Sequence, residues 1–126
     1  MEKKKVLLVE DNSDLRDVIK TFLETAMGYE VITAKDGVEA LNILKNKKPD
    51  IKVAILDIMM RSHGGTVGDY LKKHPDYKGV PIIYHTGLTE DQIDRKILEG
   101  AYYVHKEGNS LFALKELLNR IVNIKK

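Results

Sequence analysis

Five polar residues each follow closely on a short apolar run of this sequence, and their side chains together could handle a phosphoryl group. They are Glu10, Asp11, Asp57, Thr86 and Lys106. Clustered carboxylates repel one another unless a cation lies among them, and hard oxygen ligands suit Mg²⁺. A phosphoryl group needs its oxygens neutralised, usually by a metal ion, an ammonium group and a hydroxyl, and a carboxylate can itself accept the group.

The apolar runs alternate with segments of helical periodicity, which predicts a parallel sheet covered by helices on both faces. Strands are expected over residues 6–9, 31–34, 53–56, 82–84 and 102–104. Helices are expected over residues 15–26 and 38–44, from Gly64-Gly65 to about 74, from Thr89 to about 98, and over 111–122. The alternation predicts a doubly wound α/β fold that fills residues 1–126 as one domain.

Two helix boundaries carry recognisable capping residues. Asn12 or Ser13 can cap the first helix, and Gly28 stands where a left-handed residue would end it. Thr89 and Gln92 have the capping-box spacing that predicts the start of the fourth helix.

The carboxyl ends of parallel strands meet at one edge of such a sheet, so the polar residues named first are expected to converge there. A simpler explanation is that acids in this position cap the helices that follow. That explanation suffices for Glu10 and Asp11 taken alone. It does not account for polar groups at four strand ends together, and a common site is therefore favoured.

Several segments of the sequence resemble those of response-regulator receiver domains, the CheY-like family of two-component signalling. They cover residues 6–12, 54–60 and 82–87, followed by Gly100-Ala101, Tyr103 and Lys106. Their order and spacing match over essentially the whole chain. The resemblance implies a flavodoxin-like, five-stranded parallel sheet in the order 2-1-3-4-5.

The resemblance also implies a phosphoacceptor site. Asp57 would take a phosphoryl group from a phosphohistidine on a sensor histidine kinase or a histidine phosphotransfer protein. Mg²⁺ would be held by Glu10, Asp11 and Asp57 and by the backbone carbonyl of Met59. Lys106 would pair with Asp57 before the transfer and with a phosphoryl oxygen after it.

A conformational switch is the further implication of the resemblance. Thr86 would swing toward the phosphoryl group and Tyr103 would follow it inward. The face built from the fourth helix, fifth strand and fifth helix would then change shape for an effector that the sequence does not name. Such a protein is no enzyme beyond its own phosphorylation and dephosphorylation.

Two positions depart from the family pattern. Arg61 stands where a proline usually follows the acceptor by four residues, and Glu107-Gly108 stands where a proline usually follows the lysine. Without that second proline, the loop into the last helix is expected to be looser or differently shaped. Residues 61–65 could also present a basic loop to a ligand, although a solvated loop is the simpler interpretation.

Paired histidines and tyrosines raise two further questions. His85 and His105 each precede a site residue on neighbouring strands, so they are expected side by side, facing away from the site. Such a pair could sense pH or bind a metal, but structural histidines are the simpler explanation. Alternation along the strand places one of Tyr102 and Tyr103 inside and the other outside, and Tyr103 is favoured as the switch.

Composition excludes several classes of protein. The chain has 126 residues and no cysteine, so a disulfide framework and a thiolate zinc site are ruled out. Apolar residues make up 43% and charged residues 32%, and no apolar run reaches membrane-spanning length, so we expect a cytoplasmic protein without a membrane partner. The net charge is +2, and no basic face with aromatic residues indicates direct contact with nucleic acid.

Two rival functions remain to be weighed. A phosphate-independent interaction module could use the same fold, but the complete set of site residues argues against it. An enzyme that binds a nucleotide or flavin would need a glycine-rich loop after the first strand, and residues 10–13 are acidic and contain no glycine.

Overall fold

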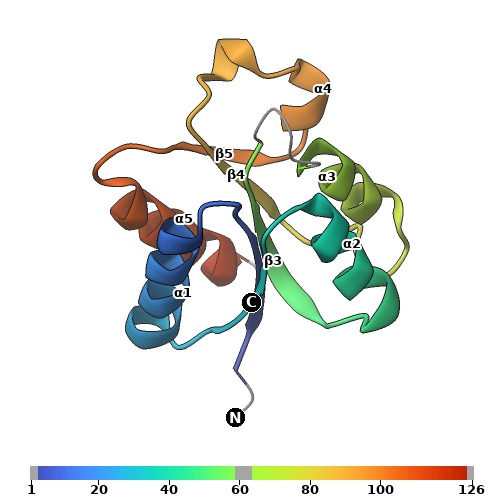
Figure 1. The fold of residues 1–126 in the computed structure, drawn as a ribbon, viewed down its shortest axis with the longest axis horizontal. Coiled ribbons are helices and arrows are strands. Elements are labelled where there is room, and N and C mark those ends of the chain that lie inside the picture. Colours follow the sequence, from blue (N-terminus) through green and yellow to red (C-terminus); the bar gives the residue numbers. More distant parts are fainter. Residues whose placement is uncertain (1–2, 59–63, 125–126) are drawn as a thin grey trace.

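The computed structural model describes residues 3–58 and 64–124. Figure 1 shows a central sheet with α1 and α5 on one face and α2 and α3 on the other. The strands are β1 (Lys5–Val9), β2 (Glu30–Ala34), β3 (Ile51–Leu56), β4 (Ile82–Thr86) and β5 (Tyr102–His105). The helices are α1 (Ser13–Met27), α2 (Gly37–Asn46), α3 (Gly64–Lys73), the 3₁₀ turn η1 (Glu90–Gln92), α4 (Arg95–Leu98) and α5 (Ser110–Ile124).

The strands pair in parallel in the order β2-β1-β3-β4-β5, which confirms the predicted fold. Each observed strand contains its predicted range and extends it by one or two residues. The strand order reverses between β1 and β3, because β2 lies on one side of β1 and the later strands lie on the other. Ligand sites in open parallel sheets form at this kind of reversal, beyond the carboxyl ends of the strands.

Successive residues of the inner strands divide between two apolar layers, as the pleat requires. In β1 and β3, Leu8 and Ile55 pack in the layer that α1 and α5 cover. Leu7 and Leu56 pack in the layer that α2 and α3 cover. All four side chains are at most 1% exposed, so the sheet is packed on both faces, and this packing positions the loops at its carboxyl edge.

The boundaries of α1 follow the prediction. The side-chain oxygen of Asn12 accepts a hydrogen bond from the backbone of Leu15 over 2.9 Å, so Asn12 is the capping residue. Gly28 ends the helix with φ 71°, and its N–H donates to the carbonyl of Leu23. Within the described ranges, no helix has the length and apolar character needed to cross a bilayer.

The helix predicted from Thr89 to about residue 98 is wrong in its extent. The side chain of Gln92 accepts from the N–H of Thr89 over 2.8 Å, as in a capping box, but only the three-residue turn η1 follows. Ile93 is extended, with φ −110° and ψ 136°, and its side chain is 6% exposed. Burial of that side chain interrupts the helix, and Asp94 then caps the separate α4 by accepting from the N–H of Lys96.

Candidate functional site

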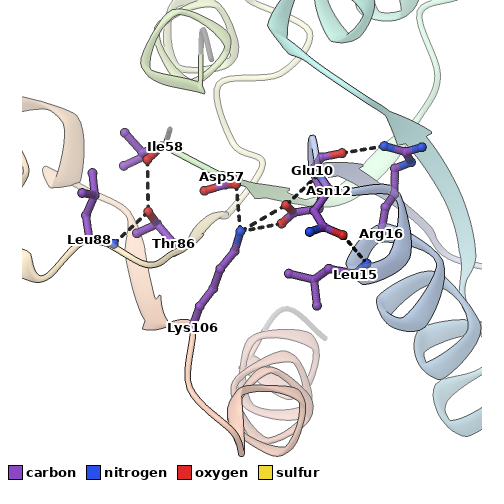
Figure 2. Close-up of polar contacts among 9 residues, drawn as sticks. All are labelled: Glu10, Asn12, Leu15, Arg16, Asp57, Ile58, Thr86, Leu88 and Lys106. Atoms are coloured by element: carbon purple, nitrogen blue, oxygen red, sulfur yellow. Dashed lines mark hydrogen bonds and ion pairs between the residues drawn. The ribbon is translucent and has the colours of Figure 1, made fainter. Parts of the chain in front are cut away.

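The carboxyl edge of the sheet brings together side chains from the ends of three strands. The ammonium nitrogen of Lys106 lies 2.8 Å from Oδ2 of Asp57 and 2.9 Å from Oε1 of Glu10 (Figure 2). Glu10 follows β1, Asp57 follows β3 and Lys106 follows β5. Glu10 and Asp57 are 1% and 2% exposed, so the ammonium serves two carboxylates that water barely reaches.

Asp11 adds an exposed third carboxylate to this edge. One oxygen each from Glu10, Asp11 and Asp57 lie within 4.8 Å of one another. Three carboxylates and one ammonium group, that of Lys106, lie at this edge, so positive charge is in deficit there. Carboxylate oxygens at such separations suit a hard divalent cation, and the donor set therefore fits a metal ion of this class.

The pKa values of these groups reflect burial and their mutual charges. Burial raises the pKa of Glu10 to about 7, and the charge of Asp57 adds to this against the opposing hydrogen bond from Lys106. Burial likewise raises the pKa of Asp57. Burial alone would lower the pKa of Lys106, but its hydrogen bonds to Asp57 and Glu10 and their charges outweigh that effect and raise it. The ammonium is thus firmly charged, whereas Glu10 titrates close to neutral pH.

Backbone and side-chain contacts also hold Glu10 in place. The N–H of Asn12 donates to Oε2 of Glu10 over 3.2 Å, and a guanidinium nitrogen of Arg16 donates to the Glu10 carbonyl over 2.9 Å (Figure 2). The suggestion that Glu10 merely caps the following helix is wrong, because Asn12 fills that position. Arg16 was missed in the sequence, since a basic residue on the first turn of a helix carries no signal of this contact.

Thr86 is fully buried at the end of β4. Its hydroxyl donates to the carbonyl of Ile58 over 3.1 Å and accepts from the N–H of Leu88 over 3.2 Å (Figure 2). Because Ile58 directly follows Asp57, this hydroxyl connects the loop after β4 to the backbone beside the acidic cluster. The predicted switch hydroxyl therefore lies at the predicted edge.

Tyr103 is half-buried, and the neighbouring Tyr102 is 41% exposed. The Tyr103 hydroxyl donates to the carbonyl of Leu88 over 2.6 Å. Burial and nearby carboxylates raise the pKa of Tyr103, so its hydroxyl keeps its proton. Both Thr86 and Tyr103 thus contact the loop after β4, and they meet at Leu88.

The predicted pairing of His85 with His105 is wrong. His85 lies opposite Val104 in the sheet register and His105 lies opposite Thr86, so the two imidazoles project from opposite faces. His85 is 1% exposed, and among the described residues neither of its ring nitrogens has a hydrogen-bond partner. Burial, with a smaller contribution from the charge of Lys106, lowers the pKa of His85 to about 4 and keeps the ring neutral.

Some sequence-based predictions concern residues that the structure does not describe. Met59 and Arg61 fall outside the described residues, so the carbonyl ligand and the basic-loop hypothesis stay predictions. None of the described peptide bonds is cis, including those around Glu107.

A cavity of about 400 Å³ lies at the opposite edge of the sheet, lined by Lys4, Ile51 and Pro81 among others, and takes no part in the acidic site.

Comparisons with known proteins agree with this geometry. The family model described as response regulator receiver domain matches residues 6–121. The chain is 42% identical over 122 residues to the probable transcriptional regulator ycf27 of Guillardia theta, covering 94% of this chain and 44% of that protein. It is 36% identical over 122 residues to the response regulator SaeR of Staphylococcus aureus, covering 94% and 49%. The chain thus spans about half the length of these curated relatives.

Solved structures show the same similarity. The response regulator TrrA of Thermotoga maritima, in a complex with Mg²⁺ and BeF, is 32% identical with a TM-score of 0.79, and the match covers 94% of this chain and 98% of that one. The chemotaxis response regulator CheY4 of Vibrio cholerae is 30% identical with a TM-score of 0.77, covering 95% and 99%. Family model, relatives and fold agree, and this chain belongs to the response regulator receiver domains of two-component signalling.

Proposed function

We propose that Asp57 is the phosphoacceptor of this receiver, and that residues 1–126 act as one receiver domain. The phosphoryl donor would be a phosphohistidine on a sensor histidine kinase or a histidine phosphotransfer protein. The observation that carries the proposal is the position of Asp57, whose buried carboxylate lies 2.8 Å from Lys106 at the reversal of strand order. We place this transfer in the cytoplasm, as expected from the sequence.

The cation that we propose for the site is Mg²⁺, held by Glu10, Asp11 and Asp57. One carboxylate oxygen from each of these residues lies within 4.8 Å of the other two. The solved structure of the similar TrrA is a complex with Mg²⁺ and BeF. Bound Mg²⁺ would neutralise the carboxylates and the oxygens of the incoming phosphoryl group. The carbonyl of Met59 stays a predicted fourth protein ligand.

The chain's own residues would carry out the transfer and the response. An oxygen of Asp57 would attack phosphorus while the bond to the donor imidazole breaks, which yields an acyl phosphate and a free histidine. Lys106, already beside Asp57, would stabilise the charge on a phosphoryl oxygen. Thr86 would exchange its bond to the Ile58 carbonyl for one to the phosphoryl group.

The proposed response would reach a partner through the loop after β4 and the neighbouring β5 and α5. Movement of Thr86 would pull on Leu88, which Tyr103 also contacts. Tyr102 on β5 and Phe112 on α5 are 41% and 62% exposed, so apolar surface is available there for an effector protein. That effector would be a separate protein or a further part of a longer chain, and we propose no direct contact with nucleic acid for these residues.

Incubation with Mg²⁺ and acetyl phosphate, followed by intact-mass measurement, tests the function. The wild type should gain one phosphoryl mass, Asp57→Asn should gain none, and chelation of the metal should prevent the gain. Asp91→Asn, an exposed acid of η1, is the matched control and should behave as the wild type. A wild type that takes up no phosphoryl group would instead favour the phosphate-independent interaction module, and labelling of Asp57→Asn would refute the assignment of the acceptor.

A further inference from the structure

Two side chains of β5 contact consecutive carbonyls in the loop that follows β4. The hydroxyl of Tyr103 donates to the carbonyl of Leu88 over 2.6 Å. Nε2 of His105 lies 3.1 Å from the carbonyl oxygen of Gly87. The two rings lie on the same face of β5, with centroids 6.5 Å apart. The loop is therefore held at two adjacent peptide groups from the same strand.

The other nitrogen of the His105 ring contacts Glu107. Nδ1 lies 3.1 Å from Oε1 of Glu107, and the carboxylate and the Gly87 carbonyl can only accept hydrogen bonds. Both bonds exist together only when both ring nitrogens carry hydrogen, because either neutral tautomer can donate only one. An imidazolium between a carboxylate and a carbonyl is thus the form that satisfies all three groups.

The contacted loop directly follows Thr86, the last residue of β4. That hydroxyl accepts from the N–H of Leu88, so the position of Thr86 and the conformation of the Gly87–Leu88 peptide depend on each other. The backbone N–H of Lys106 also donates to the Thr86 carbonyl over 2.8 Å. The segment from His105 to Glu107 therefore contacts the loop after β4 and contains the lysine of the acidic site.

We propose that His105 is a positioning residue of the switch: its ring, oriented by Glu107, holds the Gly87 carbonyl and thereby keeps Thr86 away from the acidic site until phosphorylation. The inference rests on the proposed function, because Thr86 would have to leave its present contacts to reach a phosphoryl group. The carboxylate comes from the residue that replaces the family's usual proline after the lysine.

Two amide substitutions separate the contacts of the two ring nitrogens. The side-chain nitrogen of Gln in His105→Gln can take the place of Nε2 and donate to Gly87, but it loses Glu107. In His105→Asn the shorter amide matches Nδ1, so it can face Glu107 but does not reach Gly87. The two variants are equally uncharged and differ by one methylene, so each serves as the control for the other.

Amide hydrogen exchange of Leu88, in protein without Mg²⁺ or phosphate, is the first measurement. Loss of one hydrogen bond should speed this exchange about tenfold in His105→Asn, and His105→Gln should stay within about twofold of the wild type. Exchange in His105→Asn equal to that of the wild type overturns the proposal. Equally fast exchange in both variants overturns the bond to Gly87 as its cause.

The second measurement is the fraction of protein molecules in the switched conformation after addition of Mg²⁺ and acetyl phosphate. This fraction is read from the NMR chemical shifts of the Thr86 and Leu88 amides. His105→Asn should reach the switched shifts at a lower phosphoryl occupancy than the wild type, and His105→Gln should follow the wild type. The same occupancy dependence in all three proteins overturns the link to switching. A wild type without any phosphoryl uptake refutes the proposed function, whereas the exchange result tests the loop contact independently.

Discussion

Lys106 and Glu10 lie 96 positions apart in the sequence, yet their charged groups approach to 2.9 Å at the carboxyl edge of the sheet. The same ammonium lies 2.8 Å from Asp57, so two buried carboxylates depend on a single lysine. Without Lys106, the buried carboxylates of Glu10 and Asp57 would repel each other with no compensating cation, which should lower the stability of the protein.

Replacing Lys106 by methionine should destabilise the metal-free protein by on the order of 3 kcal/mol, because Glu10 and Asp57 lose their shared cation. Mg²⁺ should stabilise this variant more than the wild type, since the site then carries one more uncompensated negative charge. Urea unfolding with chelator and with Mg²⁺ measures both effects. Lys20→Met, which removes an exposed ion pair with Glu24, is the control and should change stability by less than about 1 kcal/mol. Equal responses of the two variants would contradict this role of Lys106.

Binding of Mg²⁺ should weaken as the pH falls below 7. In the free site, burial raises the pKa of Glu10 to about 7, and a carboxyl must lose its proton before it can coordinate a cation. The affinity should therefore rise with pH up to about 7 and level off above it, with a difference of about tenfold between pH 6 and pH 8. Titration calorimetry at the two pH values measures this. Glu10→Gln should bind more weakly at pH 8 and should lose most of the pH dependence; an unchanged dependence would identify another group.

His85 should make the protein sensitive to acid. Its folded pKa is lowered from 6.5 to about 4, so the native ring stays neutral where the unfolded ring takes up a proton. The unfolded state therefore binds more protons between pH 6.5 and pH 4, and the contribution of His85 to stability falls by about 3 kcal/mol as the pH drops through that window. His85→Leu should remove this loss, as measured by urea unfolding at pH 7 and pH 5. His74→Gln, a partly exposed control, should retain it. If the free energy of unfolding falls equally between pH 7 and pH 5 in His85→Leu and in the wild type, the loss of stability arises from another group.

A larger residue at Gly68 should destabilise the protein while Tyr84 is in place. A Cβ built on Gly68 would collide with the hydroxyl oxygen of Tyr84, whose side chain is 1% exposed, so the Tyr84 side chain or the helix must shift. Gly68→Ala should destabilise the protein by about 1–3 kcal/mol despite the better helix propensity of alanine. The double variant with Tyr84→Phe should recover part of that loss. Gly108→Ala, where a Cβ meets no atom within 4 Å, is the control in thermal unfolding. A stable Gly68→Ala single variant would contradict the predicted collision.

The sequence by itself determined the sheet, its helical layers and the edge at which the polar residues gather. Apolar runs such as residues 53–56 mark strands buried on both faces, and helical periodicity between them forces parallel pairing. The position of Asp57 after one strand and of Glu10 after another then follows from chain direction alone. The family resemblance added the strand order, which the structure confirms.

The resemblance implied that Lys106 pairs with Asp57, but only the tertiary structure decided the other contacts among these groups. The sharing of Lys106 between Glu10 and Asp57, and the contact of Thr86 with Ile58, depend on the register of strands far apart in the sequence. A shift of one residue in register exchanges the faces of a sheet, which is why His85 and His105 could not be assigned correctly from spacing. The interruption of the predicted helix at Ile93 could not be read from the sequence either, since the burial of its side chain is a property of the packed core and not of the local sequence.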